Sequence, residues 1–239
     1  MDNGTILLKI QQRLNKLASN DYDNIEAWQI VEAFNKGQVA WCRRQLHGLN
    51  TKQEGDEQSK RRIDDLQIIL TDAPLTLAKK DVYFTTTMGL PANYFEWKRV
   101  SGNALNDCCE NSRRMVITLA EEANVDELLR DHMKQPSFEW GETFCTLKNG
   151  ELLIYTNNKF EIPNVSLAYY RQPRRIEING VVDPYTNAIS TVDIESEFKD
   201  DIVELMIDEA AKILAGDIES FSQVQTATQQ VETAVGRTQ

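Results

Sequence analysis

The sequence predicts an α+β fold with helices towards both ends of the chain and a strand-rich middle. Apolar residues recur every three or four positions near both ends, which is the spacing of an amphipathic helix. Between residues 63 and 170 they instead come in short runs rich in Val, Ile, Thr, Tyr and Phe, which favours strands. The 239 residues, 41% of them hydrophobic, are enough to bury a core in one domain or in two small parts.

The first 48 residues are predicted to form a helical hairpin. The first helix covers residues 5–18, and its apolar residues fall on one face: Ile6, Leu7, Ile10, Leu14 and Leu17. A second helix is predicted to start at Asp23, because Glu26 follows three residues later and the pair fits a capping box. This second helix is expected to run to about His47.

Seven short segments of the middle region are predicted to be strands. They are residues 66–70, 81–87, 94–100, 114–119, 142–147, 151–156 and 165–171. The Lys-Asn-Gly sequence at 148–150 predicts a tight hairpin turn, because Asn and Gly tolerate positive φ. One helix is predicted among the strands, from residue 120 or 124 to residue 132.

The strongest helix pattern lies near the C-terminal end of the sequence. Its apolar residues repeat at intervals of four: Phe198, Ile202, Met206, Ala210 and Leu214. The predicted organisation is therefore a helical core from residues 1–48 and 190–224, and a β-rich region with one short helix at 60–180. Residues 225–239 form a polar C-terminal tail. The four tryptophans are expected in hydrophobic cores.

The formal charge of −11 argues against a protein that grips nucleic acid, because phosphate binding needs a surplus of Lys and Arg. A negative surface suits either ordinary solubility or a channel past which DNA slides without sticking. No apolar stretch is long enough to cross a membrane, and the first residues lack the basic region of a secretory signal. The protein is therefore expected to fold in the cytoplasm, with its four cysteines reduced.

The sequence predicts no catalytic residue, no cofactor and no metal site. It contains neither phosphate-binding glycine motif, and its two histidines lie outside any recognisable nucleophile motif. Two clusters leave alternatives open. Asp193, Glu195 and Glu197 fit either a hard cation or the acidic start of a helix. The Tyr-Tyr-Arg sequence at 169–171, with the arginines at 174 and 175, fits either stacking on bases or a protein interface.

Residues 154–218 resemble ring or head-to-tail adaptor (connector) proteins of crAss-like phages and their podovirus relatives. The resemblance includes a Leu-x-Tyr-Tyr-x-x-Pro-x-x-Ile strand, here at residues 167–176, and an acidic-Phe start of a long helix, here Glu197 and Phe198. The helix ends in an Ala-rich Ala-x-x-Ile-Leu-Ala-Gly-Asp-Ile segment, whose last residue here is Ile218. A polar, Gln-rich ending follows in both. The first 150 residues match those proteins only in the order of elements.

The resemblance implies a structural virion protein, not an enzyme, made in the host bacterial cytoplasm and located at the neck. It implies a homo-oligomeric ring of twelve copies, with the portal protein above and further ring or tail proteins below. DNA would pass through its channel without specific binding, and no membrane would be involved. Since a ring needs two different contact faces, an interface is expected. Its candidate residues are Tyr169, Tyr170, Arg171, Arg174, Arg175, Phe221 and Val224.

Two alternative functions remain at this stage. The chain could be a small α+β enzyme associated with a metal or nucleic acid, using the carboxylates or the Tyr-Arg cluster. It could instead be an assembly chaperone that is absent from the finished virion. The two differ in whether the protein has an activity or only an assembly role.

Overall fold

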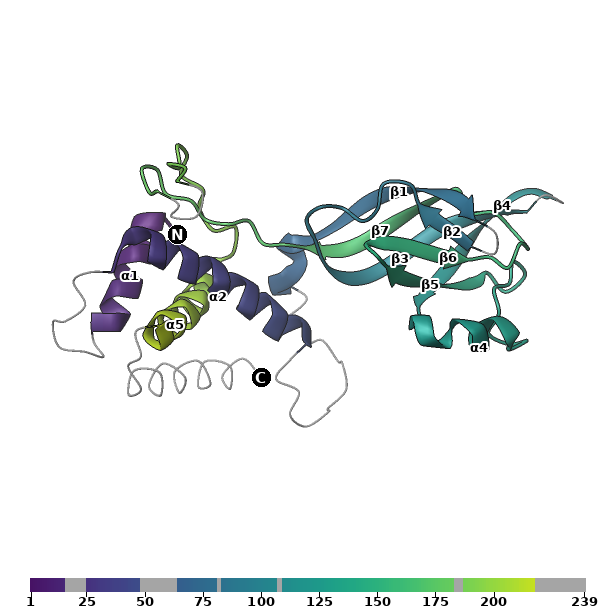
Figure 1. Cartoon of the computed structure of the whole chain (residues 1–239), viewed down its shortest axis with the longest axis horizontal. Helices are drawn as coiled ribbons and strands as arrows, with labels where there is room; N and C mark the ends of the chain where they lie inside the picture. Colours follow the sequence, from purple (N-terminus) through teal and green to yellow (C-terminus); the bar gives the residue numbers. More distant parts are fainter. Residues whose placement is uncertain (16–24, 48–63, 81–82, 107–108, 183–186, 218–239) are drawn as a thin grey trace. The chain divides into compact units, whose positions relative to one another are not determined.

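Helices from both ends of the chain and a sheet from its middle confirm the predicted α+β class (Figure 1). The computed structural model describes residues 1–15, 25–47, 64–80, 83–106, 109–182 and 187–217. The chain divides into two units, which we call the helical unit (Met1–Ile68 with Pro173–Gln239) and the barrel unit (Ile69–Gln172). Among the described helices, none combines the length and the apolar character that a membrane crossing requires.

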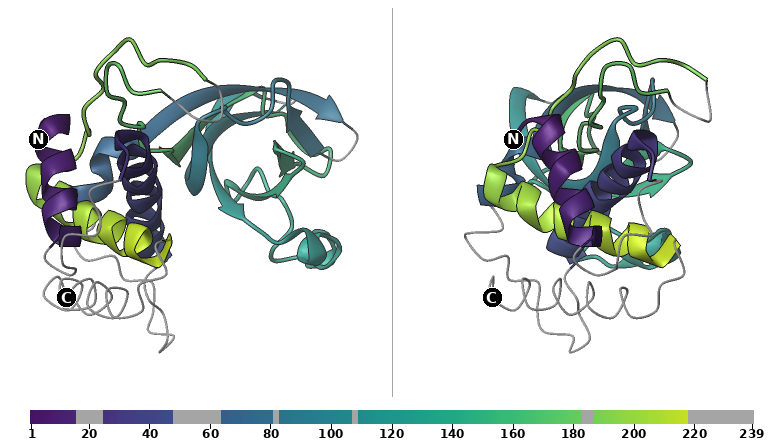
Figure 2. Two further views of the ribbon diagram at one scale, coloured as in Figure 1. Left: turned by 60° about the vertical axis from the view of Figure 1, so that its left-hand side comes forward. Right: turned by 90° about the vertical axis from the view of Figure 1, so that its left-hand side faces the viewer.

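The helical unit is built around α5 (Asp200–Asp217), which contacts both α1 (Asn3–Asn15) and α2 (Ala27–His47). Figure 2 shows α5 crossing α2. The three helices bury large apolar side chains, among them Ile6, Ile10, Leu14, Ile30, Phe34, Trp41, Ile202, Met206 and Ile207. Residues 16–24, which would join α1 and α2 into the predicted hairpin, lie outside the described residues, as does the predicted cap Asp23.

The start of α2 is nevertheless capped by a side chain. The backbone N–H of Glu26 donates to Oε1 of Gln29 at 3.0 Å, and the N–H of Gln29 donates to the Glu26 carbonyl at 3.0 Å. This reciprocal pair satisfies backbone donors that the first turn of a helix cannot pair internally. The capping pair therefore consists of Glu26 and Gln29, one helical turn after the predicted start.

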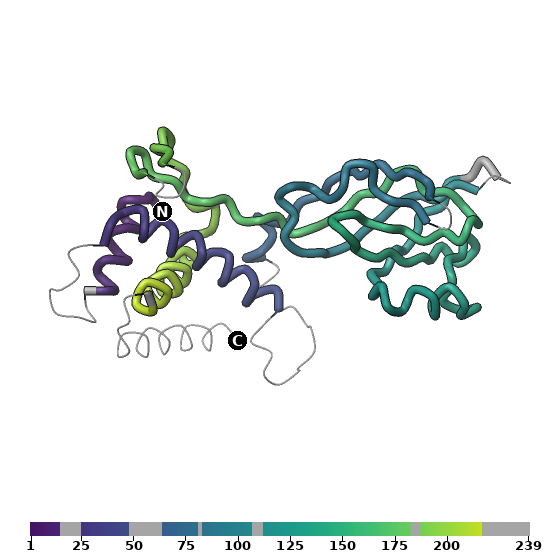
Figure 3. Tube along the Cα trace, in the orientation of Figure 1, coloured from purple at the N-terminus to yellow at the C-terminus, as the bar shows by residue number. Residues whose placement is uncertain are grey.

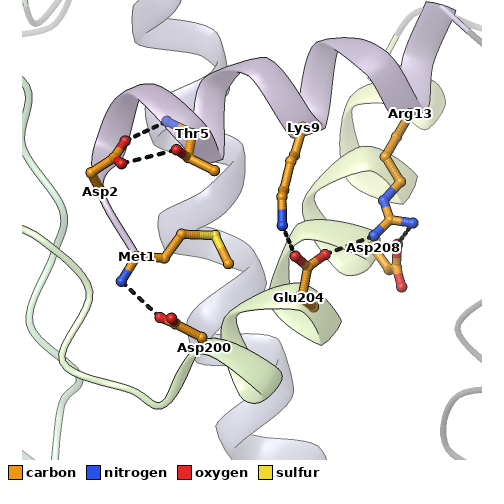
Figure 4. A network of polar contacts seen from close by, with 8 residues as sticks. All are labelled: Met1, Asp2, Thr5, Lys9, Arg13, Asp200, Glu204 and Asp208. Atoms are coloured by element: carbon orange, nitrogen blue, oxygen red, sulfur yellow. Dashed lines mark hydrogen bonds and ion pairs between the residues drawn. The ribbon is translucent and has the colours of Figure 1, made fainter.

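Charged side chains align α1 with α5 (Figure 4). Lys9 and Arg13 both pair with Glu204, and Nη1 of Arg13 lies 2.9 Å from Oδ1 of Asp208. Burial raises the pKa of Asp208, and the charge of Arg13 partly offsets that rise. Partly exposed pairs of this kind contribute only about 0.2–1 kcal/mol each, so we assign them to the register of the helices more than to stability.

The barrel unit is a closed sheet of the seven described strands, in the order β1-β2-β6-β5-β4-β3-β7, with β7 returning to β1. The strands are β1 (Leu70–Lys80), β2 (Tyr83–Thr86), β3 (Tyr94–Asn106), β4 (Cys109–Leu119), β5 (Glu142–Lys148), β6 (Glu151–Tyr155) and β7 (Asn164–Arg171). Alternate residues point inward and fill the barrel, among them Val100, Met115, Ile117, Leu152, Ile154, Val165 and Leu167. Figure 2 shows the strands curving around this interior.

One strand pair, β4 and β5, is parallel. Parallel neighbours need a crossover connection, and here it contains η2 (Glu122–Asn124) and α4 (Val125–Arg130). The predicted helix in this region is therefore confirmed, although it is shorter than expected. Val125 packs with Phe144, Leu153 and Tyr155 on the outer face of the sheet. This cover explains why β5 and β6 are apolar on both faces.

The strand prediction for residues 66–70 is wrong. Residues 64–66 are helical, η1 (Gln67–Ile69) follows, and β1 begins only at Leu70. Leu66 and Ile69, three residues apart, are both fully buried, which a helical turn allows and alternation along a strand does not.

Most of β1 was not predicted at all. Its inward positions include the small Ala73, and Pro74 lies in the middle of the strand, so the local pattern is weak. Backbone pairing with β2 and β7 holds this segment as a strand although its local sequence pattern is weak. The Cα trace shows the chain entering the barrel through β1 and leaving through β7, where Leu70 pairs with Tyr170 (Figure 3).

The predicted Lys-Asn-Gly turn joins β5 and β6, with φ of 54° at Asn149 and 74° at Gly150. Replacing Gly150 with alanine is expected to lower the free energy of unfolding by about 1 kcal/mol, the cost of holding a side-chain-bearing residue at positive φ. No atom lies within 4 Å of the added methyl, so the cost is purely conformational. Urea unfolding measures this loss of stability. Asn149→Gly is the control, with no expected loss, and an unchanged Gly150→Ala variant would contradict the turn.

Cys42 and Cys145 provide a chemical test of the two cores. Each is fully buried in its own unit, and burial raises the pKa of each thiol to about 12. At pH 8 both thiols are therefore neutral and inaccessible. We expect iodoacetamide to leave both unmodified in the native protein and to modify both in urea, as measured by peptide mass spectrometry. Fast labelling of either thiol in the native protein would contradict the packing of its unit.

Candidate interaction surfaces

A doubled-back segment, here called the arm, extends from residue 176 to residue 194, of which residues 183–186 are not described (Figure 3). Two isolated β-bridges hold its two sides together, Glu177 with Ile194 and Val182 with Ile189. The N–H of Ser190 donates to the Val181 carbonyl at 3.0 Å. Despite this pairing the arm carries exposed apolar side chains, including Ile189, which is 62% exposed.

The base of the arm is fixed by buried side-chain amides. Asn35 of α2 both accepts from the N–H of Ile176 at 2.8 Å and donates to the Ile176 carbonyl at 3.2 Å. Gln38 donates to Oδ1 of Asn35 at 3.0 Å. From α1, Nδ2 of Asn3 donates to the carbonyl of Glu177 at 2.9 Å. The arm therefore has a defined position on the helical unit, because buried backbone groups require such partners.

A groove with a volume of about 360 Å³ lies between the arm and α2. Its apolar lining consists of Trp28 and Val31 from α2, with Ile176, Ile178, Val181, Val182, Ala188 and Ile189 from the arm. Glu32, Arg175 and Glu177 supply the charged groups of the lining. A concave, mainly apolar surface with a few charged groups is typical of binding sites.

The barrel unit has an exposed tryptophan on a tightly held turn. Trp140 is 76% exposed, so the expectation that all four tryptophans lie in cores is wrong for this one. The turn is closed by backbone hydrogen bonds: Ser137 and Glu142 exchange both, at 2.9 and 3.2 Å, and Gly141 adopts a φ of 70°. Phe138 packs against the barrel core and anchors the turn.

Strand β4 extends this exposed surface. The N–H of Val116 donates to the Gly141 carbonyl at 2.7 Å, and the Val116 side chain is 61% exposed. The side chain of Arg113 lies against Gly141, and Arg114 is also exposed. We call Arg113, Arg114, Val116 and Trp140, together with the exposed Glu139 and Glu142 on either side of Trp140, the barrel patch. Exposed apolar groups beside arginine are characteristic of protein interfaces.

The candidate interface residues Tyr169 and Tyr170 are each only 4% exposed. The hydroxyl of Tyr169 donates to Oδ1 of Asn93 at 2.8 Å, and its ring stacks on Tyr94 at 5.7 Å. Lys98 lies 5.8 Å from the centre of the Tyr170 ring. Both tyrosine rings are therefore covered within the chain, and neither is available to a partner without rearrangement.

The structure separates the remaining candidate residues. Arg171 belongs to the barrel unit and donates to the Gln172 carbonyl at 3.3 Å. Arg174 and Arg175 belong to the helical unit, and Arg175 lines the groove. Phe221 and Val224 lie outside the described residues.

Two acidic residues before α5 accept hydrogen bonds from backbone groups that lie 14 and 23 positions earlier in the chain. Oδ1 of Asp193 accepts from the N–H of Asn179 at 3.0 Å, and Oε1 of Glu197 accepts from the N–H of Arg174 at 2.9 Å. Within the part of the chain that the structure describes, no group of three His, Cys, Asp or Glu residues is placed to hold a metal ion. Both hydrogen bonds come from backbone N–H groups at residues 174 and 179, and not from the first turn of α5, so they do not decide for the helix-start interpretation.

The chain was compared with protein-family models and with curated proteins. Neither comparison finds a match. The interpretation of the groove and the barrel patch therefore depends on their own chemistry. Sequence reasoning missed both surfaces. The one available signal was the Glu-Trp-Gly-Glu sequence at 139–142, in which charges and a glycine flank the tryptophan as they do in an exposed turn.

Proposed function

We propose that this chain is a structural protein of a tailed phage that forms a ring beneath the portal and connects head to tail. In this proposal twelve copies surround the channel through which DNA passes, the portal protein lies above, and further ring or tail proteins lie below. The protein has no catalytic role and needs no cofactor.

One observation carries the proposal from the structural side: two unlike exposed surfaces lie on different units of one chain. The arm groove belongs to the helical unit, and the barrel patch belongs to the barrel unit. A ring is built from heterologous contacts, in which each copy uses two different faces. A two-fold dimer would need only one self-complementary face.

Two features of the sequence add support. The resemblance to head-to-tail adaptors covers residues 154–218, which include β7, the arm and α5. The net charge of −11 suits a channel that DNA must leave freely, because negative walls repel phosphates.

Mass spectrometry of purified phage particles tests this function. We expect the chain at several copies per particle, and electron microscopy should show a ring at the neck. Absence from particles would contradict the proposal, and presence in infected cells alone would favour the assembly chaperone instead. As a control, the major capsid protein and the portal protein should be quantified in the same sample.

A further inference from the structure

We propose that α1 is a latch for the arm. While α1 is docked on α5, Asn3 holds the two sides of the arm together at the Glu177–Ile194 bridge, and when α1 detaches from α5 the two sides can separate. The contact lies entirely within the helical unit, so the proposal does not depend on the ring function.

The side chain of Asn3 contacts both sides of the arm at once. Glu177 and Ile194 exchange two backbone hydrogen bonds, at 3.1 and 2.9 Å, and form the β-bridge nearest the base of the arm. Nδ2 of Asn3 donates to the carbonyls of both residues, at 2.9 Å for Glu177 and 3.2 Å for Ile194. Asn3 is only 6% exposed, so water does not compete for these carbonyls. Separating the two sides of the arm therefore breaks the Asn3 contacts as well as the bridge.

The first turn of α1 holds Asn3 in place. Oδ1 of Asp2 accepts from the N–H of Thr5 at 2.6 Å, and Oδ2 accepts from the Thr5 hydroxyl at 2.9 Å (Figure 4). This is a side-chain cap on the helix that begins at Asn3. The position of Asn3 therefore follows the position of α1 as a whole.

The docking of α1 combines buried apolar side chains with a partly exposed ionic seam. Its fully buried apolar residues are Ile6, Ile10 and Leu14. Along the seam, Lys9 and Arg13 of α1 pair with Glu204 and Asp208 of α5 (Figure 4). Ion pairs that water can reach are weakened by salt, so the docking of α1 should respond to ionic strength.

The Asn3 contact is less complete than the Asn35 contact with Ile176. Oδ1 of Asn35 accepts and its Nδ2 donates, so both ends of that amide are paired. In Asn3 only Nδ2 is paired, and its buried Oδ1 has no hydrogen-bond partner in the part of the chain that the structure describes. An unpaired buried acceptor costs free energy, which contact with water recovers. We therefore expect the latch to open first, with the arm still held on α2 through Ile176.

Site-resolved hydrogen exchange on the full chain tests the latch. Asn3→Ala removes the contact itself. The amides of Glu177 and Ile194 should then exchange about 10-fold faster, because two hydrogen bonds to their carbonyls are lost, while the amides of α1 and of Ile176 keep their rates. The double variant Lys9→Ala, Arg13→Ala weakens the docking instead. It should speed exchange by about 3-fold or more both in α1 and at the Glu177–Ile194 bridge.

Combining the three substitutions provides the decisive measurement. If Asn3 couples α1 to the arm, adding Lys9→Ala and Arg13→Ala to Asn3→Ala should speed exchange in α1 and leave the Glu177–Ile194 bridge at the rate of Asn3→Ala alone. Lys148→Ala is the matched control, because it removes an exposed ion pair, with Glu122 at 2.8 Å, from the barrel unit. It should change neither α1 nor the arm.

A salt series on the wild-type protein tests the same coupling without a substitution. Raising NaCl from about 0.05 M to about 1 M should speed exchange in α1 and at the Glu177–Ile194 bridge together. In Asn3→Ala the same series should affect α1 alone.

Three results would overturn the inference. The first is an Asn3→Ala protein whose Glu177–Ile194 bridge stays fully protected. The second is faster exchange in α1 without faster exchange at the bridge, in the Lys9→Ala, Arg13→Ala variant or in high salt. The third is a triple variant in which the bridge loosens beyond Asn3→Ala. If a variant fails to fold, the wild-type salt series decides alone.

Discussion

Replacing Gly37 with valine should lower the free energy of unfolding of the helical unit by about 3 kcal/mol, the upper end of the range for overpacking a core. Gly37 lies in the middle of α2, where it meets α5. A Cβ atom at this position would lie 3.2 Å from the Met206 carbonyl oxygen and 3.3 Å from the backbone nitrogen of Ala210. Both obstacles are backbone atoms, so no side chain can rotate away, and the helices must separate.

The loss should be measured by urea denaturation, with alkylation of Cys42 as a probe specific to the helical unit. Gly216→Ala is the matched control, because Gly216 also lies in a helix and nothing occupies the space around its Cβ position. We expect that control to be neutral or to gain up to about 1 kcal/mol from better helix propensity. A Gly37→Val protein as stable as the wild type would show that α2 and α5 do not pack this closely.

Replacing Asn35 with alanine should destabilise the helical unit by about 3 kcal/mol, because it leaves two buried backbone groups of Ile176 without partners. Those groups are the N–H and the carbonyl, bound at 2.8 and 3.2 Å. Gln38 loses an acceptor as well. Each unsatisfied buried group costs about 1–3 kcal/mol, while the surrounding protein can recover part of the loss by relaxing.

The same substitution should also loosen the base of the arm, since Asn35 holds the backbone of Ile176 on α2. Thermal and urea unfolding measure the stability change, and hydrogen exchange of the Ile176 amide measures the loosening of the arm. Asn179→Ala, at an exposed position of the same arm, is the control, with an expected change within about 0.5 kcal/mol. A small effect of Asn35→Ala on both measurements would show that the arm is not fixed through α2.

The local periodicity of apolar residues was sufficient to predict most of the helices and strands, but it was insufficient to predict strand β1. The wide apolar stripe of α5 and the alternation in β7 are properties of consecutive residues, so they could be predicted without knowing their partners. Strand β1 is different, because Pro74 and Ala73 make a weak local pattern. It is a strand because Leu70–Lys80 pairs with β7, about a hundred residues further along the chain.

Which residues of the candidate interface are exposed depended even more on contacts between distant segments. The sequence placed an interface at Tyr169 and Tyr170, which are interface-type residues, but the barrel covers both rings. It placed Trp140 in a core, where most tryptophans lie, but the turn from Ser137 to Glu142 presents it to solvent. The burial of a side chain depends on which segments fold over it, and composition cannot supply that.

The sequence by itself determined the α+β class, the three long helices, the positive-φ turn at Asn149 and Gly150, and the net negative charge. These properties depend on residues near one another in the chain or on a simple sum. Only the tertiary structure decided that the strands close into a barrel and that the arm lies on α2 to form a groove. Both depend on contacts between segments far apart in sequence. A local pattern of residues does not specify which distant segment a strand or loop will contact.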